Sequence, residues 1–280
     1  MSNTNVQGAM SQETLDLPNV LNRLSGYVFA VVVGTDPHIK TWILPSALLS
    51  HHSRFFKAAI EGSFREAKES RVTLSEENPV VFEHFVQWMY IGDYYHPKKA
   101  EEGLVQCDVP MRSAEVWVLA DRLCCMGLKD HAMRHLIQMH ERHVSDLTSL
   151  CFMRPDIVAY AFANTAPNSK LRVFCVDSLV WHAKQNDHDR EMRMVDMDTP
   201  EWDILYGNCD DFFQAFFRKS YMYQGTFFVF PWNEDALKEQ YFEGVPPLPA
   251  CLGNNNSSGE TIGAAVVQKG AKKRKVGKVR

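Results

Sequence analysis

One segment, "NPVVFEHFVQWMYIG" at residues 78–92, constrains the fold more than any other part of the sequence. It begins with Asn78, a residue type that caps helix N-termini, followed by Pro79, which is favoured in the first helical position. It closes with Gly92, a typical helix stop. Between these residues, six large apolar side chains recur at helical spacing: Val81, Phe82, Phe85, Val86, Met89 and Tyr90. The sequence therefore predicts an aromatic helix that buries one face in a core.

The residues before this helix predict a small sheet with short helices. "YVFAVVV" (27–33) and "IKTWILP" (39–45) flank turn residues and indicate a β-hairpin, and "RVTL" (71–74) indicates a third strand. Between hairpin and third strand we expect a helix that ends at Gly62. Its buried face would carry Leu48, Leu49, Phe55, Phe56 and Ala59. Because the strands do not alternate with helices, the pattern predicts an α+β fold.

The residues after the aromatic helix are helical in pattern. We expect a helix capped by Ser113 and stopped by Gly127, and a further helix from Leu128 to His143. Residues 144–247 form a helical C-terminal extension, in which the pattern predicts a helix at 155–164, one capped by Asn168 and one at 211–222, with a charged loop at 184–201. The predicted divisions are therefore a disordered segment at 1–14, a folded domain at 15–143, the extension at 144–247 and a disordered basic tail at 248–280.

The charge is divided unevenly along the chain. The formal net charge is −4, but residues 252–280 hold seven basic residues and one acidic residue, a net +6 that leaves −10 for the body. An acidic body argues against a general nucleic-acid-binding surface on the folded part. No apolar run approaches the roughly 20 residues that a membrane span needs, and the first 20 residues lack the layout of a secretory signal. Seven scattered cysteines without a CxxC pair indicate thiols in a reducing compartment.

Several segments, taken in order, resemble the BTB/POZ family, especially the short BTB proteins of filamentous fungi. They are "LPSALLSHHSRFF", "GSFREAKESRVTL", "NPVVFEHFVQWMYIGDY" and "VWVLADRLCCMGLKDHAM", and "LRVFCVDSLVWHA" is similar to the helical extension of the fungal members. The resemblance covers residues 24–143 and, more loosely, 144–185. It implies the BTB/POZ fold: a hairpin and third strand packed with a cluster of helices, here followed by an all-helical extension.

The resemblance also implies a function in protein–protein interaction. It implies a homodimer packed through N-terminal helices, for which this chain offers the arm Leu15, Leu17, Val20, Leu21 and Leu24. We expect a non-catalytic, transcription-related scaffold that recruits partner proteins such as transcription regulators. The alternative is a substrate adaptor of a cullin-based ubiquitin ligase, since Phe64, Arg65 and Glu66 fit the hydrophobic-x-acidic motif with which adaptor relatives dock a cullin. A structural reading stays open, in which Phe64 covers the core and Glu66 faces water.

Two departures bear on the partner. Family members often have an Asp opening the first strand and a His before the long helix, where this chain has Val28 and Pro45. In transcription-repressor relatives that pair helps to form a corepressor pocket, so the resemblance does not carry that partner mode to this chain. The sequence contains no zinc-finger pattern and no kelch-like repeat.

Two groups of reactive side chains were weighed against structural roles. Cys124, His131 and His135 would share one face of a continuous helix and are zinc-binding residue types, but Gly127 interrupts that helix, so we expect rim histidines, no metal site and no cofactor. Cys175 and His182 lie seven residues apart on another helix and are expected in its core or rim. No motif pairs a nucleophile with a base, so we assign no catalytic residue and expect that the chain is not an enzyme.

The basic tail contains "AKKRKV", which closely resembles a monopartite nuclear localisation signal. Lys272, Lys273, Arg274 and Lys275 would bind the acidic grooves of a nuclear import receptor, and we expect the nucleus as the location, with the cytoplasm also open. Nonspecific contact with nucleic acid and a solubilising tail are the alternatives. No specific nucleic-acid site and no membrane partner are expected.

Overall fold

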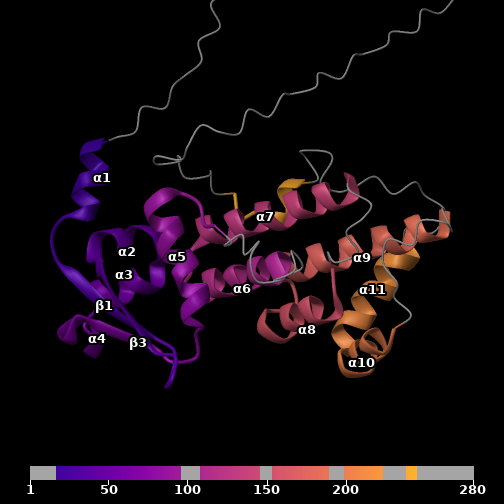
Figure 1. Ribbon diagram of the computed structural model, residues 1–280, viewed down its shortest axis with the longest axis horizontal. Helices are drawn as coiled ribbons and strands as arrows, with labels where there is room; N and C mark the ends of the chain where they lie inside the picture. The colour runs from indigo at the N-terminus through magenta and orange to yellow at the C-terminus, as the bar shows by residue number, and fades with distance from the viewer. Residues whose placement is uncertain (1–16, 96–107, 146–152, 189–198, 223–237, 245–280) are drawn as a thin grey trace, which may run out of the picture.

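The computed structural model describes residues 17–95, 108–145, 153–188, 199–222 and 238–244. A small sheet and the first five helices lie at one end of the molecule, α6 and α7 run through its middle, and α8 to α11 lie at the other end (Figure 1). The architecture confirms the predicted α+β fold followed by helices.

The elements follow one another in an order that the sequence largely predicts. The strands are β1 (Val28–Val33), β2 (Lys40–Pro45) and β3 (Arg71–Leu74). The helices around the sheet and in the middle are α1 (Leu17–Leu24), α2 (Ser46–His52), α3 (Arg54–Glu61), α4 (Arg65–Glu69), α5 (Pro79–Ile91), α6 (Asp108–Arg122) and α7 (Met126–Ser145). The remaining helices are α8 (Pro155–Asn164), α9 (Lys170–His188), α10 (Pro200–Asn208), α11 (Asp210–Met222) and the 3-10 turn η1 (Glu239–Tyr241).

The sheet has the strand order β2-β1-β3, with β1 in the centre. The predicted hairpin is confirmed: β1 and β2 pair antiparallel, from Val28 opposite Pro45 to Val33 opposite Lys40. β3 pairs with β1 in parallel, which a strand can do only after a crossover, here α2 to α4. Gly34 leaves β1 with φ +88, and a Cβ there would lie 2.9 Å from both the His38 carbonyl oxygen and Pro79 Cγ. This turn therefore requires glycine.

The aromatic helix is α5, and its predicted ends are confirmed. Asn78 Oδ1 accepts a hydrogen bond from the Val80 N–H at 2.9 Å, and Gly92 closes the helix with φ 75. Phe82 and Phe85 are fully buried with their ring centroids 5.3 Å apart, and Phe85 stacks on Phe56 of α3 at 5.8 Å. These rings fill the space between α3 and the sheet.

The expected single helix between β2 and Gly62 is two helices. Ser53 separates them with extended backbone angles, and its hydroxyl accepts the Phe56 N–H at 3.1 Å while it donates to the Leu123 carbonyl at 2.6 Å. A buried serine hydroxyl with both partners stabilises this break, because it caps α3 and ties it to the end of α6. The link after Gly62 also contains the one-turn helix α4, which the sequence analysis did not predict.

The predicted boundaries of α6 and α7 were wrong. α6 starts at Asp108, and Pro110 is compatible with this start because proline is tolerated in the first turn of a helix. Ser113 is therefore buried within α6 and is not its cap. α6 ends at a turn in which Cys124 adopts φ 50, the Cys124 N–H donates to Asp121 O at 3.0 Å, and the Cys125 N–H donates to Ala120 O at 2.8 Å. This is the Schellman pattern, here with cysteine in the position that glycine usually takes. Gly127 therefore lies in the first turn of α7.

The extension begins α9 one residue later than predicted, since the Ser169 hydroxyl, rather than Asn168, accepts the Arg172 N–H at 3.3 Å. α10 replaces the end of the expected charged loop. A buried ionic group joins three elements: Asp177 of α9 accepts from the Tyr241 hydroxyl at 2.6 Å and pairs with Lys219 of α11 at 2.5 Å.

One hydrophobic core runs through both ends of the molecule. Its buried residues extend without interruption from Phe29 in β1 to Tyr241 in η1. α6 packs against α5, α7 and α8, so it connects the sheet end with the extension. The predicted domain boundary at residue 143 falls in the last turn of α7. Within the described part of the chain, no helix combines the length and apolar character that a bilayer crossing demands.

Candidate functional site

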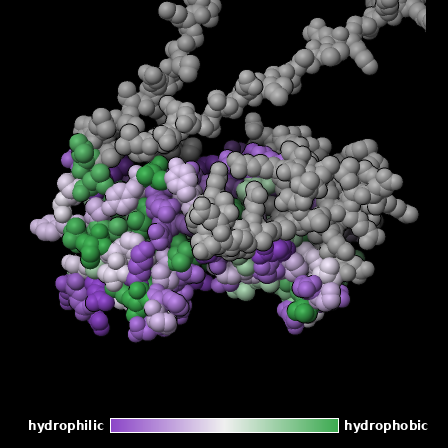
Figure 2. All heavy atoms as spheres, in the orientation of Figure 1, coloured by the Kyte–Doolittle hydropathy of each residue, from purple (hydrophilic) through white to green (hydrophobic). Residues whose placement is uncertain are grey.

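Large apolar side chains are exposed at the sheet end of the molecule. We define the N-terminal apolar surface by five of them: Leu21, Leu24, Tyr27, Val28 and Ile43. They come from α1, from the start of β1 and from the outer face of β2, and Figure 2 shows hydrophobic atoms gathered at this end. Exposed apolar surface of this kind marks interaction sites.

Two residues of the predicted dimer arm, Leu21 and Leu24, belong to this surface. α1 begins at Leu17, packs beside α2, and carries Leu21 and Leu24 exposed to solvent. The side chains of Leu17 and Val20 are not described, and Leu15 lies outside the described residues.

The link that carries the hydrophobic-x-acidic motif leads from α3 into β3. Phe64 is 65% exposed at the start of α4, and Glu66, two residues further on, is half-buried. Arg65 is exposed and pairs with Glu69 at 2.8 Å along the same helix. The structural reading in which Phe64 covers the core is therefore wrong, because the ring projects into solvent.

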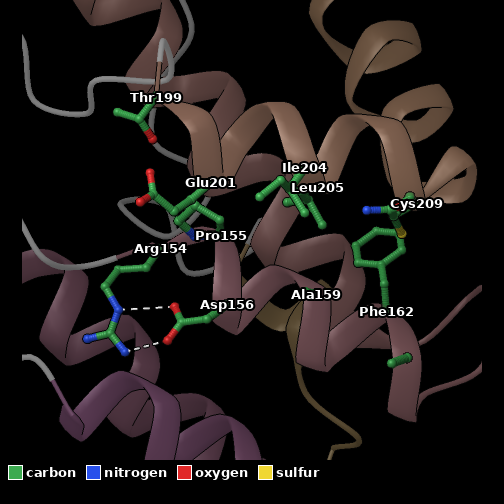
Figure 3. Close-up of a pocket in the computed structure, with 12 residues that line it drawn as sticks. Arg154, Pro155, Asp156, Ala159, Phe162, Thr199, Glu201, Ile204, Leu205 and Cys209 are labelled. Atoms are coloured by element: carbon green, nitrogen blue, oxygen red, sulfur yellow. Dashed lines mark hydrogen bonds and ion pairs between the residues drawn. The ribbon is translucent and has the colours of Figure 1, made fainter.

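A cleft opens between α8 and α10 in the extension. It has a volume of about 970 Å³, and Figure 3 shows an apolar floor of Ile204, Leu205 and Phe162. On its rim Arg154 donates to both carboxylate oxygens of Asp156, at 3.0 and 2.7 Å. This cleft was not predicted because α10 was not predicted, although Thr199, Pro200 and the acidic first turn are helix-start signals.

Asp93, His131 and His135 form a cluster that joins two distant segments. Asp93 Oδ1 lies 2.9 Å from His131 Nε2 and 3.3 Å from His135 Nε2. Cys124 is not a member of this cluster, because the turn at the end of α6 separates it from the helix of the two histidines. The spacing of the histidines was a signal in the sequence, whereas nothing in it pointed to Asp93.

Cys175 and His182 are fully buried in α9. Burial raises the pKa of the Cys175 thiol to about 12, so this thiol is protonated near neutral pH and is closed to solvent. His182 packs against His140 of α7, with ring centroids 4.9 Å apart. Both residues therefore serve the packing of the extension.

In a comparison with known families, residues 44–140 match the model of the BTB/POZ domain. Together with the three-stranded sheet and its cluster of helices, this match decides the fold. Residues 44–140 have the BTB/POZ fold. A search of the curated proteins found no match to the chain.

A BTB/POZ domain is a protein-interaction module, and such domains commonly self-associate and bind other proteins. The domain match includes the link with Phe64, Arg65 and Glu66, and it ends within α7, before the extension. The likeness of the extension to fungal BTB proteins therefore stays a prediction. The two departures from the family lie where the sequence places them: Val28 opens β1 with its side chain exposed, and Pro45 precedes α2.

The four basic residues of the predicted nuclear signal, Lys272 to Lys275, lie outside the described residues. Two surfaces with exposed apolar side chains lie at the sheet end of the described chain: the N-terminal apolar surface, just before the matched residues, and the link, within them.

Proposed function

We propose that the chain is a BTB/POZ homodimer that recruits other proteins in the nucleus, as a transcription-related scaffold. The observation that carries this proposal is the N-terminal apolar surface. It includes the exposed Leu21 and Leu24 of the amphipathic helix α1, which packs beside α2. A self-complementary surface on a helix and sheet face suits a two-fold dimer, in which the same patch serves both partners.

The size of the exposed residues supports a stable contact. The buried centre of a protein interface is more apolar than its rim and is enriched in aromatic residues such as tyrosine. None of the five residues of the surface is an aspartate, glutamate, lysine, arginine or histidine, so a dimer would bury them without leaving the charge of such a side chain unpaired.

Light scattering on the full chain over a dilution series tests the dimer. We expect twice the chain mass of 32.1 kDa at micromolar concentrations. A mass of one chain at every concentration up to about 100 µM would contradict the proposal, because that corresponds to less than roughly 5.5 kcal/mol of association free energy.

A second function, cullin adaptor, is favoured by the exposure of Phe64. An aromatic ring that projects from a short helix is the kind of anchor that fills a pocket on a partner, and a nearby carboxylate can fix the register of the contact. Phe64 and Glu66 are two residues apart at the start of α4, and both are reachable from solvent. The link lies apart from α1, so a dimer could hold two scaffolds at once.

Affinity capture with a purified cullin tests this second function. The wild-type chain is compared with a Phe64→Ala, Glu66→Lys variant and with a control, Phe217→Ala, which removes an equally exposed ring from α11. We expect the first variant to lose binding by at least about 30-fold, since truncating a hot-spot residue costs 2 kcal/mol or more. Equal binding by all three proteins, or binding by none, would exclude the adaptor function.

The nuclear location rests on the basic cluster Lys272 to Lys275 in a tail that contrasts with the acidic body. A fluorescent fusion in which these four residues are changed to glutamine should lose nuclear enrichment. The matched control changes Lys269, Lys278 and Arg280 to glutamine, which lowers the tail charge but keeps the cluster. If both variants stay nuclear, the cluster does not direct the protein there.

A further inference from the structure

Three potential metal ligands of the BTB/POZ domain meet where the end of α5 lies against α7. His131 and His135 are four residues apart on α7, so their side chains leave the same face of the helix one turn apart. Gly92 ends α5 in a left-handed conformation, and the next residue, Asp93, reaches this face. The three side chains therefore meet through tertiary packing rather than through one continuous helix.

We propose that Asp93, His131 and His135 bind one divalent transition-metal ion, with Zn²⁺ as the probe. Two imidazoles and one carboxylate form a donor set that zinc accepts, with bonds of about 2.0–2.2 Å. Two ligands at such distances are about 2.9 Å apart at a right angle and about 3.4 Å apart at a tetrahedral angle. The observed separations from Asp93 Oδ1, 2.9 and 3.3 Å, lie in this range.

Aromatic packing holds the two histidines of the cluster in place. Tyr94 is buried, and its ring centroid lies 4.5 Å from that of His135 and 5.3 Å from that of His131. His84 of α5 stacks on the other side of the tyrosine at 5.2 Å. These contacts fix the imidazole rings, as a preformed binding site requires.

One side of the cluster remains open to solvent. The Asp93 side chain is 42% exposed, while the two histidines are mostly covered. Three protein ligands with an open fourth position allow water, or a side chain of a bound partner, to complete the coordination. Such an ion would link the end of α5 to α7 within the BTB/POZ domain.

The competing account is a hydrogen-bonded cluster without an ion, in which Asp93 Oδ1 accepts from both histidines and from the Tyr94 N–H. Zinc titration of the full chain against a chromogenic chelator separates the two accounts. We compare wild type with Asp93→Asn, with His131→Gln plus His135→Gln, and with a control, His38→Gln, which removes an exposed histidine. Circular dichroism verifies that each variant is folded.

We expect wild type and His38→Gln to bind one more Zn²⁺ tightly than the double histidine variant does. Asp93→Asn should weaken this ion by at least about 100-fold, since even outer-shell changes weaken metal sites by 10- to 100-fold. Zinc bound equally by all four proteins would mean adventitious binding to other thiols and histidines and would overturn the proposal. Absence of binding by wild type would overturn it as well.

A second measurement needs no variant and so does not depend on variant folding. Wild-type protein is treated with diethylpyrocarbonate with and without Zn²⁺, and the modified histidines are identified by mass spectrometry. We expect zinc to protect His131 and His135 while His38 reacts equally in both samples. Unchanged modification of His131 and His135 would count against the site, whatever the titration shows. Neither result bears on dimerisation, so this inference and the proposed function can fail separately.

Discussion

Replacing Leu21 by glutamate should break the proposed dimer and leave the monomer folded. Leu21 is 64% exposed in the described chain, and glutamate is a good helix former, so α1 should persist. Full burial of a leucine side chain contributes about 1.5–3 kcal/mol, so burying the exposed share contributes about 1–2 kcal/mol per protomer. A two-fold interface contains the residue twice, which gives about 2–4 kcal/mol for the dimer.

This loss corresponds to an increase of about 30- to 700-fold in the dimer Kd, since 1.4 kcal/mol is a factor of ten. Sedimentation over a concentration series measures the shift. The control is Ile204→Glu, which places the same charge on an aliphatic residue of equal exposure, 63%, in α10 at the far end of the molecule. The same dimer Kd for both variants would refute the assignment of α1 to the interface.

Three further predictions concern stability, which urea unfolding measures. Lys219→Met removes the cation that pairs with the buried Asp177 carboxylate and should lower the free energy of unfolding by about 3 kcal/mol. Lys40→Met removes only the exposed pair with Glu83 and should lower it by less than ~1 kcal/mol. Similar losses in the two variants would contradict a structural role for the buried pair. Gly34→Ala should lower the free energy of unfolding by about 1–3 kcal/mol, because residue 34 has a positive φ and the added Cβ would meet atoms at 2.9 Å. Gly207→Ala in α10 adds a Cβ that meets no atom within 4 Å and should raise the free energy of unfolding by about 0.5–1 kcal/mol. An unchanged stability of the Gly34 variant would show that this turn can adjust. His52 packs on Trp88 at 5.1 Å, and burial, with smaller contributions from His51 and Arg23, lowers its pKa from 6.5 to about 3. The unfolded chain therefore binds the proton more readily, so stability is complete above pH 6.5 and falls by up to about 1.4 kcal/mol per pH unit below it; His52→Leu should flatten this slope relative to His38→Leu, and parallel slopes would disprove the coupling.

The sequence predicted those elements whose information is local. The aromatic helix α5 has its cap, its first proline and its closing glycine within 15 residues, and the structure places all three as expected. The hairpin was equally readable, because apolar runs flank a turn. In both cases the side chains that define the element also determine its ends.

The sequence did not predict elements whose ends depend on distant partners. The break between α2 and α3 is stabilised by the Ser53 hydroxyl on the Leu123 carbonyl, 70 residues away in the chain. The turn at Cys124 uses a non-glycine residue with positive φ, which composition does not reveal. The sequence predicted the interruption at Gly127 and weighed His131 and His135 only against Cys124, so their actual neighbour, Asp93, was not found.

The position of α6 has a consequence for any attempt to isolate residues 15–143 from the helical extension. α8 lies against α6 through a buried face that includes Ile157, Val158 and Ala161, and Arg122 at the end of α6 donates to Asn164 of α8 at 2.8 Å. A fragment that ends at residue 143 would expose the surface of α6 on which α8 packs, and it would tend to aggregate. For the same reason, a relative that lost α8 to α11 would also need polar residues on the face of α6 that α8 covers. Sequence changes in α6 and in the extension are therefore expected to be coupled.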